Sequence, residues 1–302
     1  MAHTDVILPT EAGRELPGVR SITPMDLWDV LAKGVDDFRA MPTHAIFLSL
    51  IYPLAGLAVA YWTFGFNIVP LLYPLLAGFA LIGPFAAVGL YELSRRREMG
   101  LDTSGRHAFD ILHSPSLWSI LALGLLLLAL FGVWLGVAHG LYVSLFGVDE
   151  RPITLVELWR RITTTPEGHR LLWTGNLVGA LFALTSFALS VISFPLLLDR
   201  NVGMATAIVT SVRAILRNPL TMALWGLIVA VGLALGSLPF LFGLAVVMPI
   251  LGHATWHLYR TVVTPDLASR RPELHRRPRG QRYAADFPSA LFLPLMRDDR
   301  KE

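Results

Sequence analysis

The sequence contains no cysteine, although it is 302 residues long. This absence excludes disulfides, thiolate metal sites, iron–sulfur clusters and covalently attached c-type haem. Lysine is nearly absent as well: of the 25 basic residues, only Lys33 and Lys301 are lysines, and the others are arginines. This bias toward arginine is typical of a protein from a GC-rich bacterial genome. The first 40 residues carry acids and prolines without an apolar core, so we expect no cleavable signal peptide.

Charge is scarce too: 16% of the residues are charged, against about 25% in a typical soluble domain. Charged residues are missing from four long runs, 40–91, 111–148, 171–198 and 218–259. A helix crosses the roughly 30 Å hydrocarbon core of a bilayer in about 20 residues. The first and last runs are long enough for two crossings each, and the middle two for one each. The sequence therefore predicts an all-α membrane protein with six transmembrane helices.

The basic residues indicate how these helices are oriented. Of the 25 Lys and Arg residues, 21 lie in segments that would share one side with both termini, and 4 lie on the opposite side. Because cytoplasmic loops are enriched in Lys and Arg, we predict a multi-pass protein of the bacterial inner membrane with both termini cytoplasmic. Arg95, Arg96 and Arg97 directly follow the second predicted span, and they are predicted to contact anionic lipid head groups or a partner protein.

A surface helix is expected before the first span, starting where Thr23 and Pro24 form a helix start signal. Its apolar stripe is Trp28, Leu31, Val35 and Phe38, and its polar face is Asp29, Asp36 and Asp37. This pattern is typical of an amphipathic helix that lies on the membrane surface. The spans themselves are expected at about 44–64, 68–91, 116–146, 172–198, 220–235 and 240–259.

Three short motifs predict a threefold internal repeat. DFRAMP, DILHSP and AILRNP end at Pro42, Pro115 and Pro219, and each stands directly before a predicted span. In each, residues four and seven positions before the proline are apolar, as on one face of a helix that the proline ends. The predicted fold is three helical hairpins, each preceded by an amphipathic cytoplasmic surface helix. The predicted domains are an N-terminal cytoplasmic tail (1–22), a six-span membrane domain (23–263, with units 23–91, 92–199 and 200–260) and a basic, proline-rich cytoplasmic tail (264–302).

Two histidines, His253 and His257, stand four residues apart near the end of the sixth predicted span. At this spacing they share one helical face and could bind a metal ion or a haem. No third ligand stands at the same depth, since His139 lies toward the other membrane face. The alternative is a pair of interfacial histidines that end the span, and we expect no haem, metal or other cofactor.

The second and fourth spans carry four candidates for a transport path. Pro74 and Pro84 predict a kink in the second span, and Ser186 and Ser190 belong to a stripe of small residues in the fourth. Broken helices and intramembrane polar groups line some transport paths. A stripe of small residues is more typical of a tight helix–helix seam, which is the interpretation that we favour. No acid or base stands in the middle of a predicted span, so the usual mark of ion coupling is missing.

Three stretches of the sequence resemble a family of bacterial integral membrane proteins of unknown function. They are ITPMDLWDVLAKGVDDF (22–38), PLLAGFALIGPFAAVGLYELSRRREMG (74–100) and LRNP (216–219). Some members of that family are labelled as cytochrome c oxidase subunits, but the family has no established activity. A catalytic haem–copper subunit needs several histidines deep in its helices and about twice as many spans. The sequence therefore gives little support to a catalytic oxidase role, and an accessory role beside an oxidase stays open.

No phosphate-binding loop, catalytic triad motif or nucleic-acid-binding module is present in the sequence. We therefore favour a protein that is not an enzyme and binds no nucleic acid. Its predicted partners are the bilayer, with anionic lipids at the cytoplasmic face, and another membrane protein. The predicted function is a non-catalytic accessory or scaffold subunit, with a respiratory oxidase as a candidate partner. The first alternative is a transporter or channel for a small neutral or lipid-like substrate, and the second is a haem or metal membrane protein.

Overall fold

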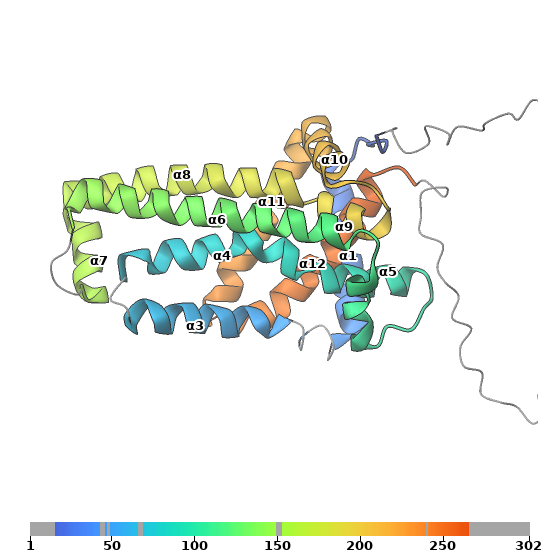
Figure 1. The fold of residues 1–302 in the computed structure, drawn as a ribbon, viewed down its shortest axis with the longest axis horizontal. Coiled ribbons are helices and arrows are strands. Elements are labelled where there is room, and N and C mark those ends of the chain that lie inside the picture. The colour runs from blue at the N-terminus through green and yellow to red at the C-terminus, as the bar shows by residue number, and fades with distance from the viewer. Residues whose placement is uncertain are drawn as a thin grey trace, which may run out of the picture. The chain divides into compact units, whose positions relative to one another are not determined.

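The computed structural model describes residues 16–42, 46, 49–65, 69–148, 153–239 and 241–265. These residues are almost all helical and form no β-strand, which confirms the predicted all-α class. The α-helices are α1 (Pro24–Ala40), α3 (Ile51–Gly65), α4 (Leu72–Ala86), α5 (Val88–Glu98), α6 (Leu117–Phe146), α7 (Leu155–Thr164), α8 (Pro166–Ser190), α9 (Ser193–Asp199), α10 (Met204–Arg217), α11 (Pro219–Ser237) and α12 (Leu244–Val262) (Figure 1). Two 3-10 helices are η1 (Val69–Leu71) and η2 (Gly105–His113). The predicted tails lie almost wholly outside the described residues, as does the start of the first predicted span.

Among the described residues, three helical segments are long and apolar enough to cross a membrane: α6, α8 together with α9, and α11. They coincide with the predicted third, fourth and fifth spans. α6 has 30 residues and is therefore about 45 Å long, well beyond the roughly 30 Å hydrocarbon core. The other predicted spans fall on α3, on α4 with α5, and on α12. In the described part of the chain, none of these meets both the length and the hydropathy of a spanning helix.

Two long helical runs are interrupted close to a proline. These are the run of α4 and α5, near Pro84, and the run of α8 and α9, near Pro195. The run of α8 and α9 breaks at 191–192, where the Pro195 ring has no N–H to donate to the carbonyl four residues earlier. The run of α4 and α5 breaks at Ala87, three residues after Pro84. α12 continues through Pro249, which stands in its second turn. The missing N–H group of Pro195 thus explains the break between α8 and α9, whereas the break at Ala87 follows Pro84 and lies outside the turn that this proline disturbs.

Each predicted proline step follows a short helix, but the middle helix is not α-helical. α1 ends before Pro42 and α10 ends before Pro219, as predicted. η2, before Pro115, is the helix predicted at this position, and it is a 3-10 helix. Residues three apart lie above one another in a 3-10 helix. This geometry turns both Ala108 and Ile111 toward neighbouring apolar side chains.

α1 packs along α12 with a buried face that is rotated from the predicted stripe, although Leu31 and Phe38 of that stripe are partly buried against the core. Its buried residues are Leu27, Val30, Gly34 and Asp37. The predicted apolar stripe began at Trp28, but this side chain is 69% exposed. The prediction that Asp37 lies on the polar, exposed face is wrong, because Asp37 is buried. Gly34 explains the rotation of the helix, because only a residue without a side chain lets α1 come this close to the backbone of α12 at Ala254.

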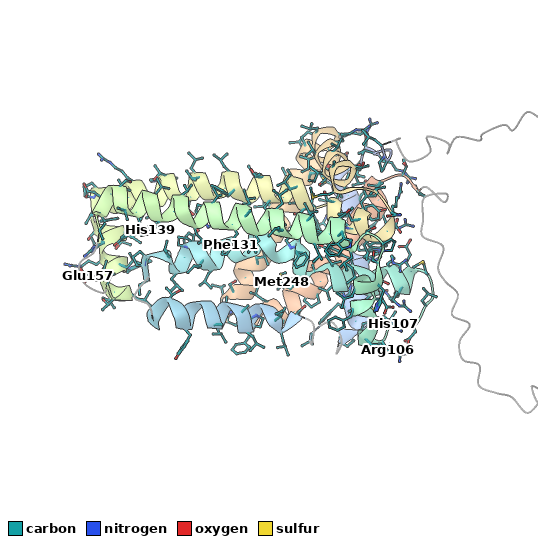
Figure 2. All side chains as sticks on the ribbon, in the orientation of Figure 1. Arg106, His107, Phe131, His139, Glu157 and Met248 are labelled. Atoms are coloured by element: carbon teal, nitrogen blue, oxygen red, sulfur yellow. The ribbon has the colours of Figure 1, made fainter. Side chains whose placement is uncertain are left out.

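Polar side chains gather at two ends of the helices, with apolar residues between them. Figure 2 shows His107 at one end, His139 and Glu157 at the other, and Phe131 and Met248 between them. We refer to the first as the polar end. It holds α1, α5, η2, α9, α10 and the last turns of α12. Residues of α1, α5, α9, α10 and α12 also share the largest hydrophobic core, so the charged groups there surround a packed interior.

Candidate functional site: a buried charge network at the polar end

Asp37 of α1 is buried against α5 and α12, with only 2% of its surface exposed. Its Oδ2 accepts a hydrogen bond from the Ser94 hydroxyl at 2.6 Å and another from His257 Nε2 at 2.9 Å. Its Oδ1 accepts one from the Arg97 guanidinium, which also pairs with Asp36 at 2.8 Å. One carboxylate therefore joins α1 to both α5 and α12.

The pKa of Asp37 lies below the ordinary aspartate value of 3.8. Burial alone would raise this pKa, because a buried carboxylate loses the water that stabilises its charge. Hydrogen bonds from His257, Ser94 and Arg97 outweigh that cost, since each of them stabilises the ionised form. The carboxylate is therefore charged at neutral pH, and it holds its three donors together.

His253 lies one turn before His257 in α12 and is completely buried. Its Nδ1 is 2.7 Å from the Ser94 hydroxyl oxygen. Because Ser94 has one hydrogen and donates it to Asp37, Nδ1 must carry a hydrogen and donate it to the serine oxygen. Nε2 is then the unprotonated nitrogen, and it has no hydrogen-bond partner within the described part of the chain.

The serine, histidine and aspartate of this group are not arranged for nucleophilic catalysis. In a catalytic triad the histidine stands between the carboxylate and the serine, so that it can take the serine proton. Here Ser94 stands between Asp37 and His253, and it is itself fully buried. The arrangement joins three helices and offers no nucleophile to a substrate.

The lowered pKa of Asp37 predicts a specific loss of stability in acid. The carboxylate stabilises the fold at pH values above 3.8, and this contribution is lost as the pH falls through the lower pKa of the folded state. We therefore expect the difference in thermal midpoint between the wild-type protein and Asp37→Asn to shrink as the pH falls from about 5 to about 3. Circular dichroism of the protein in detergent measures both midpoints. A difference that stays constant over this range would contradict the prediction.

A second polar network joins α5, α9 and α12 through two carboxylates, of which Asp199 is buried and Glu98 is exposed. Glu98 accepts hydrogen bonds from Trp256 Nε1 at 3.0 Å and from Arg260 at 2.8 Å. Asp199 accepts one from the Tyr259 hydroxyl at 2.6 Å, and Arg260 lies 3.6 Å from the same carboxylate. The last turns of α12 are thus buried although their sequence is polar, because each donor meets an acid on a neighbouring helix.

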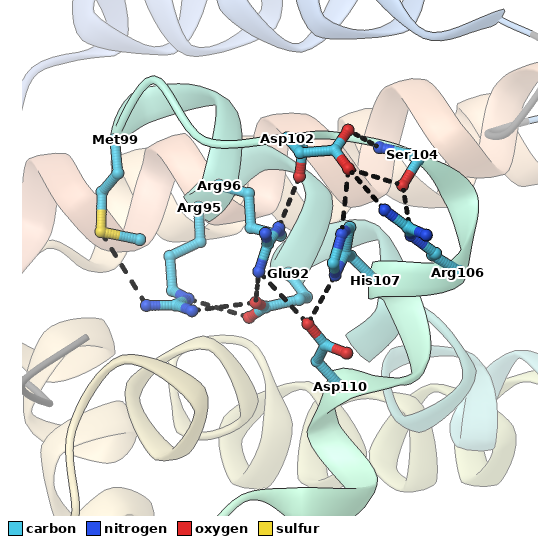
Figure 3. A network of polar contacts seen from close by, with 9 residues as sticks. All are labelled: Glu92, Arg95, Arg96, Met99, Asp102, Ser104, Arg106, His107 and Asp110. Atoms are coloured by element: carbon cyan, nitrogen blue, oxygen red, sulfur yellow. Dashed lines mark hydrogen bonds and ion pairs between the residues drawn. The ribbon is translucent and has the colours of Figure 1, made fainter. Parts of the chain in front are cut away.

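A third network connects α5 to η2 (Figure 3). Glu92 is 3% exposed and forms an ion pair with Arg95 through two hydrogen bonds, at 2.8 and 2.9 Å. Arg96 lies 3.9 Å from Glu92 and 3.2 Å from Asp110, which His107 also contacts at 2.7 Å. The other members of the network are Met99, Asp102, Ser104 and Arg106. These contacts fix η2 against α5.

The three arginines that were predicted to contact anionic lipids or a partner are all in ion pairs within the chain. Arg95 pairs with Glu92, Arg96 with Asp110, and Arg97 with both Asp36 and Asp37. Each guanidinium thus already has a carboxylate beside it. The contact with lipids or with a partner stays a prediction.

The two candidate metal or haem ligands lie together, as their spacing predicted. His253 is bound to Ser94, and His257 is bound to Asp37. Among the described residues, no group of three or more His, Asp or Glu side chains has the geometry of a metal site. The expectation that the protein holds no cofactor stays a prediction.

The four candidates for a transport path all lie in or beside packed helix contacts. Ser186 of α8 is buried and donates to a backbone carbonyl of α4 at 2.9 Å, and Ser190 donates to the carbonyl of Ser186 at 2.6 Å. The carbonyl of Pro74 accepts a hydrogen bond from Trp134 Nε1 at 2.9 Å. Pro84 is half-buried just before the break between α4 and α5. Their role in transport stays a prediction.

Sequence reasoning missed the burial of Asp37, and it did not single out Ser94 or Glu98 as members of these networks. A signal existed for Asp37, because it and Asp110 both stand five residues before a proline of the repeat. Both of these acids pair with arginines of α5. No local pattern marks Ser94 or Glu98, since their partners on α12 stand 159 and 158 positions away.

An all-helical chain with several apolar helices long enough to cross a bilayer, and with its charges paired at the helix ends, has the properties of an integral membrane protein. Residues 72–199, from α4 to α9, match the model of a family described as a predicted integral membrane protein, DUF2189. The resemblance to membrane proteins of unknown function is thereby confirmed over this segment. No curated protein and no solved structure matches the chain.

Proposed function

We propose that the chain is a multi-pass protein of the bacterial inner membrane, with six spans and both termini cytoplasmic. Aromatic side chains that are more than half exposed stand at both ends of the long helices, as they do at membrane–water interfaces. Phe109 and Trp118 lie at the polar end, and Trp159 and Trp173 lie at the opposite end. Most of the arginines belong to segments of the polar end, which supports its cytoplasmic location.

Three repeated hairpins are part of the same proposal. α1 and η2 both carry an aspartate five residues before the proline that precedes the next predicted span. Asp37 pairs with Arg97 and Asp110 pairs with Arg96, so the two acids hold adjacent arginines of α5. At the corresponding position of α10 the buried residue is Ala214. The first two units are therefore more alike than either is to the third.

Because the chain has no cysteine, single introduced cysteines report its topology without background labelling. We expect Arg106→Cys and Asn201→Cys, both exposed at the polar end, to react with a membrane-impermeant maleimide only after the inner membrane is opened. Thr164→Cys, exposed at the opposite end, should react in intact spheroplasts. Labelling of both polar-end cysteines in intact spheroplasts would contradict the orientation. Labelling of only one of Arg106→Cys and Asn201→Cys in intact spheroplasts would mean that the chain does not cross the membrane twice between these positions. That result would contradict the number of spans.

Within this topology we infer a non-catalytic accessory or scaffold role. The observation that carries it is that Asp37, Asp199 and Ser186, which are buried polar groups at the polar end and between the helices, are hydrogen-bonded within the chain. Two of the spanning helices offer wide apolar faces instead, since only 22% of the most apolar stretch of α6, and likewise of α11, is buried. Such faces contact lipid or another membrane protein.

A photo-crosslinking amino acid tests this role in native membranes. It replaces Leu128 of α6, Leu177 of α8 or Leu227 of α11, which are all more than half exposed on different helices. A partner that docks on one face should give one discrete protein crosslink from that helix, and lipid adducts alone from the others. Lipid adducts from all three positions, together with solute flux in proteoliposomes, would contradict the accessory role.

A transporter or channel is the second candidate, and one observation favours it. The breaks between α4 and α5 and between α8 and α9 lie near each other, with the rings of Phe85 and Phe194 6.1 Å apart. Neighbouring broken helices line binding sites in many transporters. The break in the second run, however, comes 25 residues after the start of α8, or about 38 Å along it, close to the polar end. Transporter sites lie near the middle of the bilayer instead.

Ser186 distinguishes a packed seam from a transport path. We expect Ser186→Ala to lower the free energy of unfolding by about 0.6 kcal/mol, the average for an interhelical hydrogen bond in a membrane. Thr185→Ala is the matched control, because Thr185 is exposed and bonds only within its own helix. Unfolding titrations in detergent measure both values. A change in solute flux without a change in stability would favour the path.

A further inference from the structure

α10 exposes a face that combines cations with large apolar side chains. Its buried face consists of Ala207, Thr210, Ser211 and Ala214. On the other side of the helix, Val209, Arg213, Leu216 and Arg217 are exposed, and Leu216 is 74% exposed. Basic and large apolar residues that are exposed together on one face are typical of an interfacial helix.

The two arginines of this face are not neutralised by acids. Arg213 makes no hydrogen bond or ion pair to any residue that the structure describes. Arg217 donates to the neutral Ser21 hydroxyl at 3.2 Å. This contrasts with the arginines of α5, each of which has a carboxylate beside it. Arg213 and Arg217, together with Val19 and Leu216, line a surface depression of about 310 Å³, near the roughly 300 Å³ lower limit of small-molecule sites.

An apolar stripe leads from this depression along α11, one of the helices able to cross a membrane. Its exposed members on α11 are Leu220, Leu224, Leu227 and Val231, spaced by three or four residues. That spacing places them on one face of α11. Leu220, in the first turn of α11, is 83% exposed and follows Leu216 of the depression by four residues, across the junction of α10 and α11. A bound molecule with one anionic end and one hydrocarbon chain would match both parts of this surface.

We propose that α10 and α11 bind one anionic phospholipid. Arg213 and Arg217 hold its phosphate, because guanidinium groups donate two hydrogen bonds at once to phosphate oxygens. One acyl chain lies along Leu216, Leu220 and the rest of the stripe. The proposal rests on the proposed membrane topology only in placing this lipid in the cytoplasmic leaflet. Figure 1 shows α10 at the polar end, beside the first described residues of the chain.

Native mass spectrometry of the full chain, stripped of lipid in detergent, tests the site directly. The delipidated protein is titrated with phosphatidylglycerol and, separately, with phosphatidylcholine. We expect one phosphatidylglycerol to bind more tightly than phosphatidylcholine. Each arginine near a lipid head group contributes about fivefold in affinity, so Arg213→Gln/Arg217→Gln should weaken the binding of phosphatidylglycerol roughly 25-fold. Lys33→Gln/Arg39→Gln is the control, since it removes the same charge from exposed positions of α1 and should change this affinity less than about twofold.

A second variant separates a lipid from free phosphate. Leu216→Asn keeps both arginines and should weaken phosphatidylglycerol binding, while glycerol phosphate alone should fail to displace the lipid. Equal affinity of the double arginine variant and the wild-type protein would overturn the proposal, as would an equal loss in the α1 control. Full displacement by glycerol phosphate would overturn the acyl-chain contact. Lipid binding in detergent does not depend on the leaflet in which the site lies. A wrong topology would therefore change the result of cysteine labelling but not the result of the lipid titration.

Discussion

Replacing Asp37 by alanine is expected to lower the free energy of unfolding by about 3 kcal/mol, the lower end of the cost of removing one partner from a buried ion pair, because Arg97 is 35% exposed and keeps Asp36. The substitution leaves Arg97, His257 and Ser94 without the acceptor that they share. Because Asp37 is 2% exposed, water cannot replace the carboxylate unless α1 separates from α12. An equilibrium unfolding titration in mild detergent, followed by circular dichroism, measures the loss.

The neighbouring residue provides a matched control for this experiment. Asp36 pairs with the same Arg97, but its side chain is 68% exposed. Solvent screens such a pair, so Asp36→Ala should cost less than about 1 kcal/mol. Similar losses for Asp36→Ala and Asp37→Ala would mean that the buried network contributes no more than a surface ion pair. That outcome would remove the energetic argument for a three-helix junction at Asp37.

A methyl group added at Gly34 is expected to cost about 3 kcal/mol, at the upper end of the range for overpacked sites. The new Cβ would lie 2.6 Å from the Cβ of Ala254, and 2.8 Å from both the backbone nitrogen of Ala254 and the carbonyl oxygen of Ile250. Backbone atoms cannot rotate away as a side chain can, so α1 must move off α12. Asp37 stands one turn further along α1, and its hydrogen bond to His257 would be stretched by the same movement.

Gly132→Ala in α6 is the control, because a Cβ at this position meets nothing within 4 Å. Alanine is preferred over glycine in helices by up to about 1 kcal/mol, so this variant should be unchanged or slightly more stable. Unfolding titrations under one set of detergent conditions compare both variants with the wild-type protein. If Gly34→Ala proves as stable as Gly132→Ala, α1 and α12 are not in the close contact on which the Asp37 network depends.

The two substitutions test one junction in two ways. Asp37→Ala removes the charge that holds the junction, whereas Gly34→Ala leaves the charge and changes the distance between the helices. The two residues are one turn apart on the same face of α1. We therefore expect their effects on stability to be less than additive in the double variant, as for other residues that share one network.

The all-α class, the spanning helices α6, α8 with α9, and α11, and the short helices before Pro42 and Pro219 were all predictable from the sequence. Each depends on a local property. A single uncharged segment that crosses hydrocarbon forms a helix, because each of its backbone N–H and C=O groups must find a hydrogen-bond partner within the segment. A proline disturbs the turn before it whatever lies around it. The break before Pro195 has the same local origin.

Tertiary structure alone decided which face of α1 is buried and which basic residues meet Asp37. The stripe that begins at Trp28 and the buried face through Gly34 and Asp37 differ by about 100° around one helix. Hydrophobicity favours the first, but the close approach to Ala254 selects the second. Ion pairing depends on distance in space, and Asp37 is 60 positions from Arg97 and 220 from His257. Such pairs form only after the helices have packed, because no local pattern in the chain encodes their separation.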